Sequence, residues 1–197
     1  DPRVERLAEV IVSYSVAVRP GDKVVIEGES LAEPLLKALY ARVLQAGGHP
    51  LMRIGLPGTE DLLFKYASDE QLQHVPGPLK LTTETYDVRI AVGGADNTRS
   101  LTNVDPAKMV LHQQGRSELM KIFMRRSATG ELRWTYVVFP TNAYAQDAEM
   151  SLGDYEDFVY GACLPDMNDP VGYWRRFSKR QQRVVDWLKG KQWLHVV

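Results

Sequence analysis

Cysteine is almost absent from this 197-residue sequence, since Cys163 is its single thiol. One thiol excludes an intrachain disulfide and a cysteine-based zinc cluster, and it is typical of proteins in a reducing compartment. No apolar run reaches the roughly 20 residues of a membrane-spanning helix, and the first residues form a charged amphipathic pattern instead of the apolar core of a signal peptide. We therefore expect a cytoplasmic protein that does not contact a membrane.

An excess of either charge is also missing. The 24 basic and 25 acidic side chains leave a formal net charge of -1. Proteins that bind nucleic acid usually carry a strong basic patch, so we expect no nucleic-acid partner. Hydrophobic residues make up 44% of the chain and charged residues 25%, which is typical of one globular domain with a substantial core.

Recognisable metal and phosphate motifs are absent as well. The histidines, none of which has the spacing of a metal motif, are His49, His74, His112 and His195. Residues 28–30 follow a strand pattern, but they lack a glycine-rich phosphate motif, and the neighbouring glutamates would repel phosphate. We therefore predict no metal ligand in this chain, and a structural role for the Cys163 thiol.

What the sequence does contain is an alternation of strand patterns and helix patterns. A strand, a helix and a second strand connected by a right-handed crossover give parallel strands. We therefore predict the α/β class, as a layered domain with a mainly parallel central sheet flanked by helices. The strands are expected over residues 23–26, 51–54, 87–92, 132–139 and 192–197.

Capping signals predict where the helices begin. A serine followed three residues later by an acid or amide can form a capping box, and an aspartate before a proline can cap a helix that starts with that proline. The capping boxes are Ser30 with Glu33, Ser68 with Gln71 and Ser151 with Asp154, and the Asp-Pro starts are at Asp1, Asp105 and Asp169. Residues 75–78 are expected to break a helix before an extended segment, and Gly115 is a candidate interruption.

Helical spacing also predicts which side chains point inward. On the three helices with the clearest apolar faces, these side chains are Leu35, Leu36, Leu39, Tyr40, Val43, Tyr155, Phe158, Val159, Ala162, Trp174, Phe177, Val184 and Leu188.

Polar loops follow three of the expected strands. If the strands are parallel, residues 27–30, 96–99 and 141–146 all leave the sheet at its carboxyl edge, where open α/β sheets usually hold ligands. Taken singly, asparagines favour turns and an arginine pairs with a surface acid. The convergence of the three loops instead favours a ligand-binding surface. The candidate cleft-lining residues are Asn97, Arg99, Thr141, Asn142 and Gln146.

Several short segments in a fixed order resemble the thermophilic metalloaminopeptidase family typified by aminopeptidase T. The longest is the Pro-Thr-Asn-Ala-Tyr-Ala-Gln-Asp-Ala-Glu-Met-Ser run within residues 139–166. Shorter ones lie at residues 14–24, 46–50, 67–72 and 130–134. The resemblance covers the whole chain and implies the N-terminal domain of an enzyme that removes amino-terminal residues from peptides.

The resemblance further implies a pair of divalent metal ions, either zinc, cobalt or magnesium. The family's metal ligands belong to its C-terminal domain, and no position of this sequence matches them. We therefore expect residues 1–190 to form an N-terminal α/β domain without metal or catalytic residues, and residues 191–197 to begin a strand that leads into the C-terminal domain. The expected partners are a peptide substrate and that C-terminal domain, with a homodimeric parent as a further possibility.

Two other functions fit the same pattern. A stand-alone nucleotide or small-ligand module would use the same strand ends, although its phosphate motifs are missing. A purely structural or dimerisation lobe would need no working surface at all. Binding of nucleotides would favour the first alternative, and loss of solubility or association on deletion would favour the second.

Overall fold

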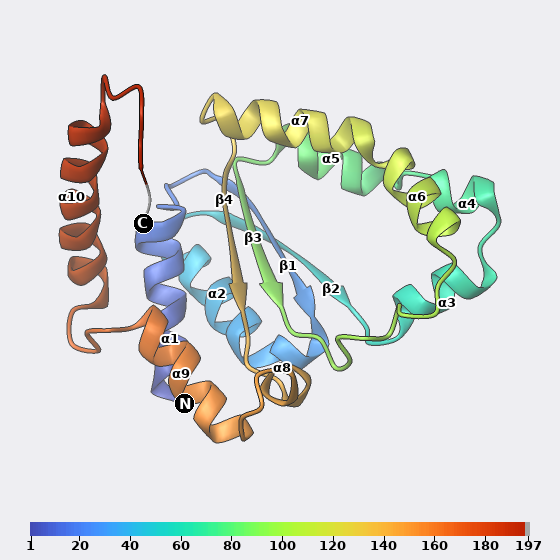
Figure 1. Cartoon of the computed structure of the whole chain (residues 1–197), viewed down its shortest axis with the longest axis horizontal. Helices are drawn as coiled ribbons and strands as arrows, with labels where there is room; N and C mark the ends of the chain where they lie inside the picture. Colours follow the sequence, from blue (N-terminus) through green and yellow to red (C-terminus); the bar gives the residue numbers. More distant parts are fainter. Residues whose placement is uncertain (196–197) are drawn as a thin grey trace.

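The computed structural model describes residues 1–195, and over these residues the chain forms a four-stranded sheet with helices on both faces (Figure 1). The strand order is β2-β1-β3-β4 and every pairing is parallel. The strands are β1 (Lys23–Glu29), β2 (His49–Gly55), β3 (Val88–Gly93) and β4 (Arg133–Val138). The predicted class and the parallel sheet are therefore confirmed.

Helices precede the first strand, connect the strands and follow the last one. They are α1 (Pro2–Val10), η1 (Ile11–Ser15), η2 (Ser30–Ala32), α2 (Glu33–Gln45), α3 (Thr59–Tyr66), α4 (Asp69–Gln73), α5 (Gly77–Thr85), α6 (Pro106–Gly115), α7 (Ser117–Ala128), α8 (Asn142–Asp147), α9 (Leu152–Cys163) and α10 (Pro170–Leu188). Among residues 1–195, no helix is long and apolar enough to span a bilayer.

The main core lies between the sheet and the layer of α1, η1 and α2. Val24 and Ile26 alternate onto this face of β1, Ile90 joins them from β3, and Leu36 and Leu39 cover them from α2. All five side chains are at most 2% exposed. Burying one such side chain stabilises the fold by roughly 1.5–3 kcal/mol, so this face holds the sheet in place.

The opposite face of the sheet is covered by α5 and α7 and is much more polar. Val25 and Glu27 of β1 and Arg89 of β3 point to this side, because side chains alternate along a strand. The side chains of Glu27, Arg89 and Arg53, the last from β2, cannot pack as closely as aliphatic side chains. A hollow therefore remains between this face and the two helices.

A smaller unit of α3, α4 and α6 lies beyond the edge strand β2 (Figure 1). Leu72 of α4 is fully buried there, and Phe64 of α3 meets His112 of α6 with ring centroids 5.3 Å apart. Gly115 ends α6 where a Cβ would collide with the backbone of Gln73. The expected interruption at Gly115 is confirmed, and it allows α6 to pack on α4.

Two expectations about helix starts are wrong. Ser30 makes no side-chain cap, because the chain passes from β1 into the short η2 and only then into α2. The Glu33 carboxylate pairs instead with Lys37 one turn later. Residues 77–85 form the helix α5 instead of an extended segment, since a proline in the first turn fits a helix start.

Some side chains expected inside are exposed. Phe158 is 62% exposed and Ala162 is exposed, while Tyr160 on the same helix is buried. The buried face of α9 differs from the predicted one because Tyr160 packs under Arg3. The Arg3 guanidinium lies 4.6 Å from the centroid of the Tyr160 ring. Tyr40 and Val184 are likewise more than a third exposed.

The strand expected over residues 192–197 is not present over residues 192–195, and 196 and 197 lie outside the described residues. Within the described part, the segment pairs with no strand of the sheet, and Trp193 is 92% exposed. An apolar segment without a neighbouring strand has no partner for its backbone hydrogen bonds, so its composition alone does not make it a strand.

Candidate functional site

The carboxyl edge of the sheet brings the loops after β3 and β4 together through Thr141. Its hydroxyl donates a hydrogen bond of 2.8 Å to the backbone oxygen of Ala95. The Thr141 hydroxyl oxygen also accepts from the backbone N–H of Tyr144 at 3.4 Å, which caps α8. Thr141 is buried, so it lies under the edge and holds both loops in position.

Beside Thr141, the side chains of Tyr136 from β4 and Tyr144 from α8 contact the end of β3 and the loop that follows it. The Tyr144 hydroxyl accepts from the backbone N–H of Ala95 at 3.4 Å. Burial raises the pKa of Tyr136, and the neighbouring Tyr144 raises it further. A Cβ at Gly93 would collide with the Tyr136 hydroxyl, so the absence of a side chain there makes room for the pair. The Tyr136 hydroxyl therefore remains protonated and can act as a hydrogen-bond donor beside the site.

A surface hollow of about 520 Å³ lies over these loops. It is lined by Asp96, Asn97, Thr98, Arg99, Ala143, Gln146 and Asp147. Three of the five predicted cleft-lining residues, Asn97, Arg99 and Gln146, therefore share one hollow. Asn142 is exposed at the first position of α8 but does not line it, and Thr141 lies below it.

Local contacts already occupy part of this polar surface. The Asn97 side-chain oxygen accepts from the backbone N–H of Arg99 at 2.9 Å, which forms a turn. The Arg99 guanidinium lies 3.8 Å from the Asp147 carboxylate, and the arginine side chain is 82% exposed. This exposed pair contributes little to stability. The Arg99 guanidinium therefore remains accessible to a bound molecule.

An acidic hollow of about 220 Å³ continues the same edge toward β2. Glu29, Glu60, Asp61 and Asp96 line it, and Asp96 and Asn97 line both hollows. Burial raises the pKa of Glu29, and the nearby Asp96 and Glu60 carboxylates raise it further. The edge therefore favours cationic groups and disfavours phosphate.

The part of this edge that follows β2 was not predicted from the sequence. The prediction included the loops after β1, β3 and β4 but omitted the loop after β2, although a parallel β2 must also end at the carboxyl edge. The glycines and acidic residues within residues 55–61 would have indicated a polar loop after this strand. The tyrosines had no such signal, since their roles depend on contacts between strands that are distant in sequence.

A metal site does not form on this edge. Over residues 1–195, no group of three or more His, Cys, Asp or Glu side chains could hold a metal ion. Cys163 is half-buried against the core, and burial raises the pKa of its thiol. A neutral thiol packed in this way is a structural group.

One known protein is similar to this chain in sequence and another is similar in fold. The chain is similar to Aminopeptidase 2 of Geobacillus stearothermophilus, with 21% identity over 210 residues that cover 100% of this chain and 50% of that protein. The solved structure of wild-type AmpT from Thermus thermophilus matches with a TM-score of 0.75 and 17% identity, covering 95% of this chain and 48% of that chain. At this identity the structural match shows a shared fold.

The chain thus spans about half the length of both relatives. In addition, the sequence pattern of one family, described as thermophilic metalloprotease (M29), matches residues 1–197. Because this match extends over the whole chain, the chain belongs to the thermophilic metalloprotease family M29.

Proposed function

We propose that this chain is the N-terminal lobe, without metal ligands, of a metal-dependent aminopeptidase that removes amino-terminal residues from peptides. The family match over the whole chain and the aminopeptidase name of a relative support this activity for the parent protein. The half-length coverage of that relative supports the assignment of this chain to one lobe.

In this proposal, the carboxyl edge of the sheet forms one wall of the peptide cleft. The observation that carries it is the shared hollow of Asn97, Arg99 and Gln146. An asparagine or glutamine amide offers both donors and an acceptor, which match the C=O and N–H groups of a peptide backbone. The adjoining acids Glu29 and Asp96 would attract the positive amino terminus of the substrate.

The family description implies divalent metal ions, and the residues present here do not fit them. Among residues 1–195, there is no side-chain group suited to even one such ion. We therefore assign the zinc, cobalt or magnesium ions to another part of the parent protein, and we derive no catalytic step from this chain. The same acidic edge argues against the nucleotide-binding alternative, because carboxylates repel phosphate.

The test uses the full-length parent enzyme with Gln146→Ala and Asn142→Ala. Gln146 lines the hollow and Asn142 lies next to it on α8, so each variant should lower kcat/KM for peptides, Gln146→Ala by about 2- to 10-fold, the value of one lost hydrogen bond. Metal content and melting temperature should remain unchanged. Gln113→Ala on α6 is the matched control, since Gln113 is exposed and lies outside the hollow.

Two results would contradict this role. Unchanged kcat/KM for Gln146→Ala would remove the cleft wall from the proposal. Parallel losses of activity and stability would instead support the purely structural lobe.

A further inference from the structure

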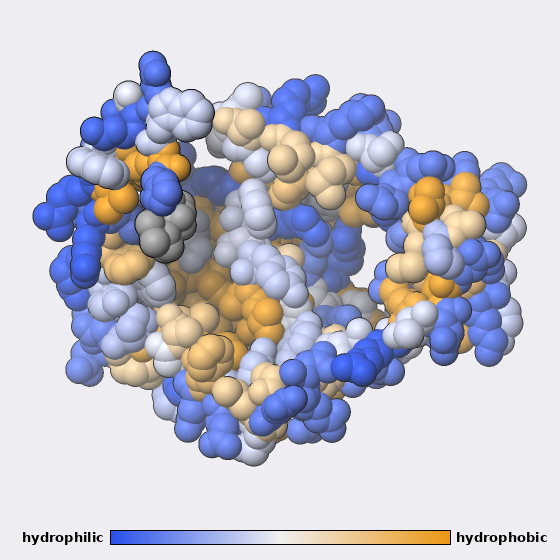
Figure 2. Space-filling view, viewed as in Figure 1, coloured by the Kyte–Doolittle hydropathy of each residue, from blue (hydrophilic) through white to orange (hydrophobic). Residues whose placement is uncertain are grey.

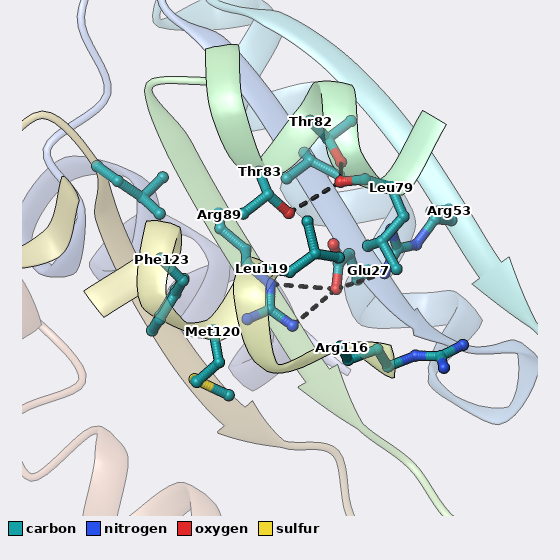
Figure 3. Close-up of a pocket in the computed structure, with 12 residues that line it drawn as sticks. Glu27, Arg53, Leu79, Thr82, Thr83, Arg89, Arg116, Leu119, Met120 and Phe123 are labelled. Carbon is teal, nitrogen blue, oxygen red and sulfur yellow. Dashed lines mark hydrogen bonds and ion pairs between the residues drawn. The ribbon is translucent and has the colours of Figure 1, made fainter. Parts of the chain in front are cut away.

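The hollow beside α5 and α7 lies on the other side of the sheet from the main core, away from the carboxyl edge. It has a volume of about 260 Å³ and lies between the sheet face and the helices α5 and α7 (Figure 3). Its lining residues are Val25, Glu27, Arg53, Leu79, Thr82, Thr83, Arg89, Arg116, Leu119, Met120, Phe123 and Leu132. We refer to it as the α5–α7 groove.

The floor of the α5–α7 groove is a charged cluster. The Glu27 side chain is 12% exposed, and one of its oxygens, Oε2, contacts Arg89 Nη2 at 3.0 Å, Arg89 Nε at 3.2 Å and Arg53 Nη2 at 3.1 Å. A carboxylate this buried requires partners to offset its loss of hydration. These contacts use a single oxygen of Glu27 and only some of the N–H groups of the two guanidiniums.

The α5–α7 groove carries a positive net charge. Three of its lining residues are arginines and one is a glutamate. Arg116 forms one end, where its Nη1 donates to the backbone oxygens of Leu72 and His112 at 3.3 Å. Arg53 and Arg89 keep side-chain exposures of 43% and 39%, so their remaining donors are accessible from the groove. The chemistry of the floor therefore favours an anion.

The walls of the α5–α7 groove are apolar. Leu79 lines it from α5, and Leu119 and Phe123 line it from α7. Met120 lies at the mouth with an exposed fraction of 60%. Figure 2 shows apolar side chains gathered over the outer surface of α7. Binding sites for small molecules combine mainly apolar walls with a few convergent polar groups, as this groove does.

We propose that the α5–α7 groove binds a small carboxylate with a branched or aromatic apolar body. The carboxylate would accept from the free N–H groups of Arg89 and Arg53, because a planar guanidinium matches a planar carboxylate. The apolar body would lie against Leu79, Leu119 and Phe123. The volume of about 260 Å³ is just below the range of drug-sized sites, which limits the ligand to a small molecule.

A monoanion fits better than a phosphate. Glu27 lies beside both guanidiniums at 3.0–3.1 Å and would repel a second negative charge. Apolar walls also leave the outer oxygens of a phosphate without partners. This site is separate from the proposed peptide cleft, because Glu27 and Arg89 point away from the residues of the carboxyl edge.

The experiment titrates 4-methylpentanoate into the 15N-labelled 197-residue protein and follows the amide signals by NMR. We expect saturable shifts that are centred on α7 and on the middle of β1. The neutral amide 4-methylpentanamide has the same apolar body and should produce no saturable shifts. No saturation by 4-methylpentanoate up to about 10 mM, where even weak sites fill, or equal binding of the amide would overturn the proposal.

The matched variants are Met120→Trp and Met124→Trp. Both methionines are 60% exposed on α7, but only Met120 lines the α5–α7 groove. A tryptophan at position 120 fills the mouth without changing any charge, so the affinity for 4-methylpentanoate should fall by at least ten-fold. Met124→Trp should bind like the unmodified protein. Equal affinities of the two folded variants would show that the ligand binds elsewhere.

Discussion

The hydroxyl of Thr141 donates a 2.8 Å hydrogen bond to the backbone oxygen of Ala95, and this bond joins the loop after β4 to the loop after β3. Both loops line the hollow at the carboxyl edge. The shape of the proposed cleft wall therefore depends on a buried residue that itself does not reach the surface.

The first prediction concerns this hydrogen bond. Thr141→Val keeps the shape of the side chain but removes the cap of α8 and leaves the Ala95 oxygen without its partner. The free energy of unfolding should fall by about 1–3 kcal/mol, the cost of a lost cap and an unsatisfied, partly buried acceptor. Urea denaturation measures this loss. Thr98→Val is the control, because Thr98 is exposed in the same hollow and should change stability by less than about 0.5 kcal/mol.

The second prediction compares two glycines. Gly93→Ala should destabilise the fold by about 1–3 kcal/mol, because its Cβ would collide with the Tyr136 hydroxyl and displace the tyrosine pair. Gly153→Ala should stabilise it by about 0.4–1 kcal/mol, since Gly153 lies inside α9 with open space around its position. Thermal unfolding of both variants checks the difference. A gain in stability for Gly93→Ala would show that the packing at Gly93 is looser than described, and a loss for Gly153→Ala would contradict the open space at that position.

The third prediction concerns Glu29 and pH. Burial and the nearby Asp96 and Glu60 carboxylates raise the pKa of Glu29 in the folded protein. The folded state therefore holds this proton more tightly than the unfolded state, and the Glu29 contribution to stability falls as the pH rises through the raised pKa. Glu29→Gln should accordingly raise the melting temperature at neutral pH. The gain should disappear below the unfolded pKa of about 4.3.

Glu33 provides a control of opposite sign for this titration. A hydrogen bond from Lys37 lowers the pKa of Glu33 in the folded protein. Its contribution to stability is thus present above the unfolded pKa and is lost as the pH falls through the lowered folded pKa. Glu33→Gln should therefore lower the melting temperature slightly at neutral pH. A gain for Glu33→Gln or a loss for Glu29→Gln would contradict the electrostatics described for this edge.

Much of the fold could be predicted from local signals. The alternation of strands and helices predicted the parallel sheet, and the capping boxes at Ser68 and Ser151 predicted the starts of α4 and α9. Wrong expectations arose where tertiary context decides. Ser30 has the residues of a capping box, but the sheet directs the chain into η2 first. Phe158 has the right spacing to be buried, but α9 turns Tyr160 toward Arg3 instead.

In the candidate site, too, some features could be predicted from local signals and others depend on tertiary contacts. The convergence of Asn97, Arg99 and Gln146 follows from parallel strands and could be predicted from the sequence. The burial of Thr141 could not, because it depends on a contact with Ala95, 46 positions away along the chain. The charged floor of the α5–α7 groove could not be predicted either, because it depends on the register of β1 with β2, which brings Glu27 opposite Arg53.

The central claim is that this chain is a lobe without metal ligands from a metal-dependent peptidase. Its most direct test is elemental analysis of the purified 197-residue protein after dialysis against excess zinc, cobalt or magnesium. We predict that the bound metal stays well below one equivalent, because scattered single ligands hold divalent ions weakly. Two equivalents of metal that survive further dialysis against metal-free buffer would contradict the account and would place the metal centre within this chain.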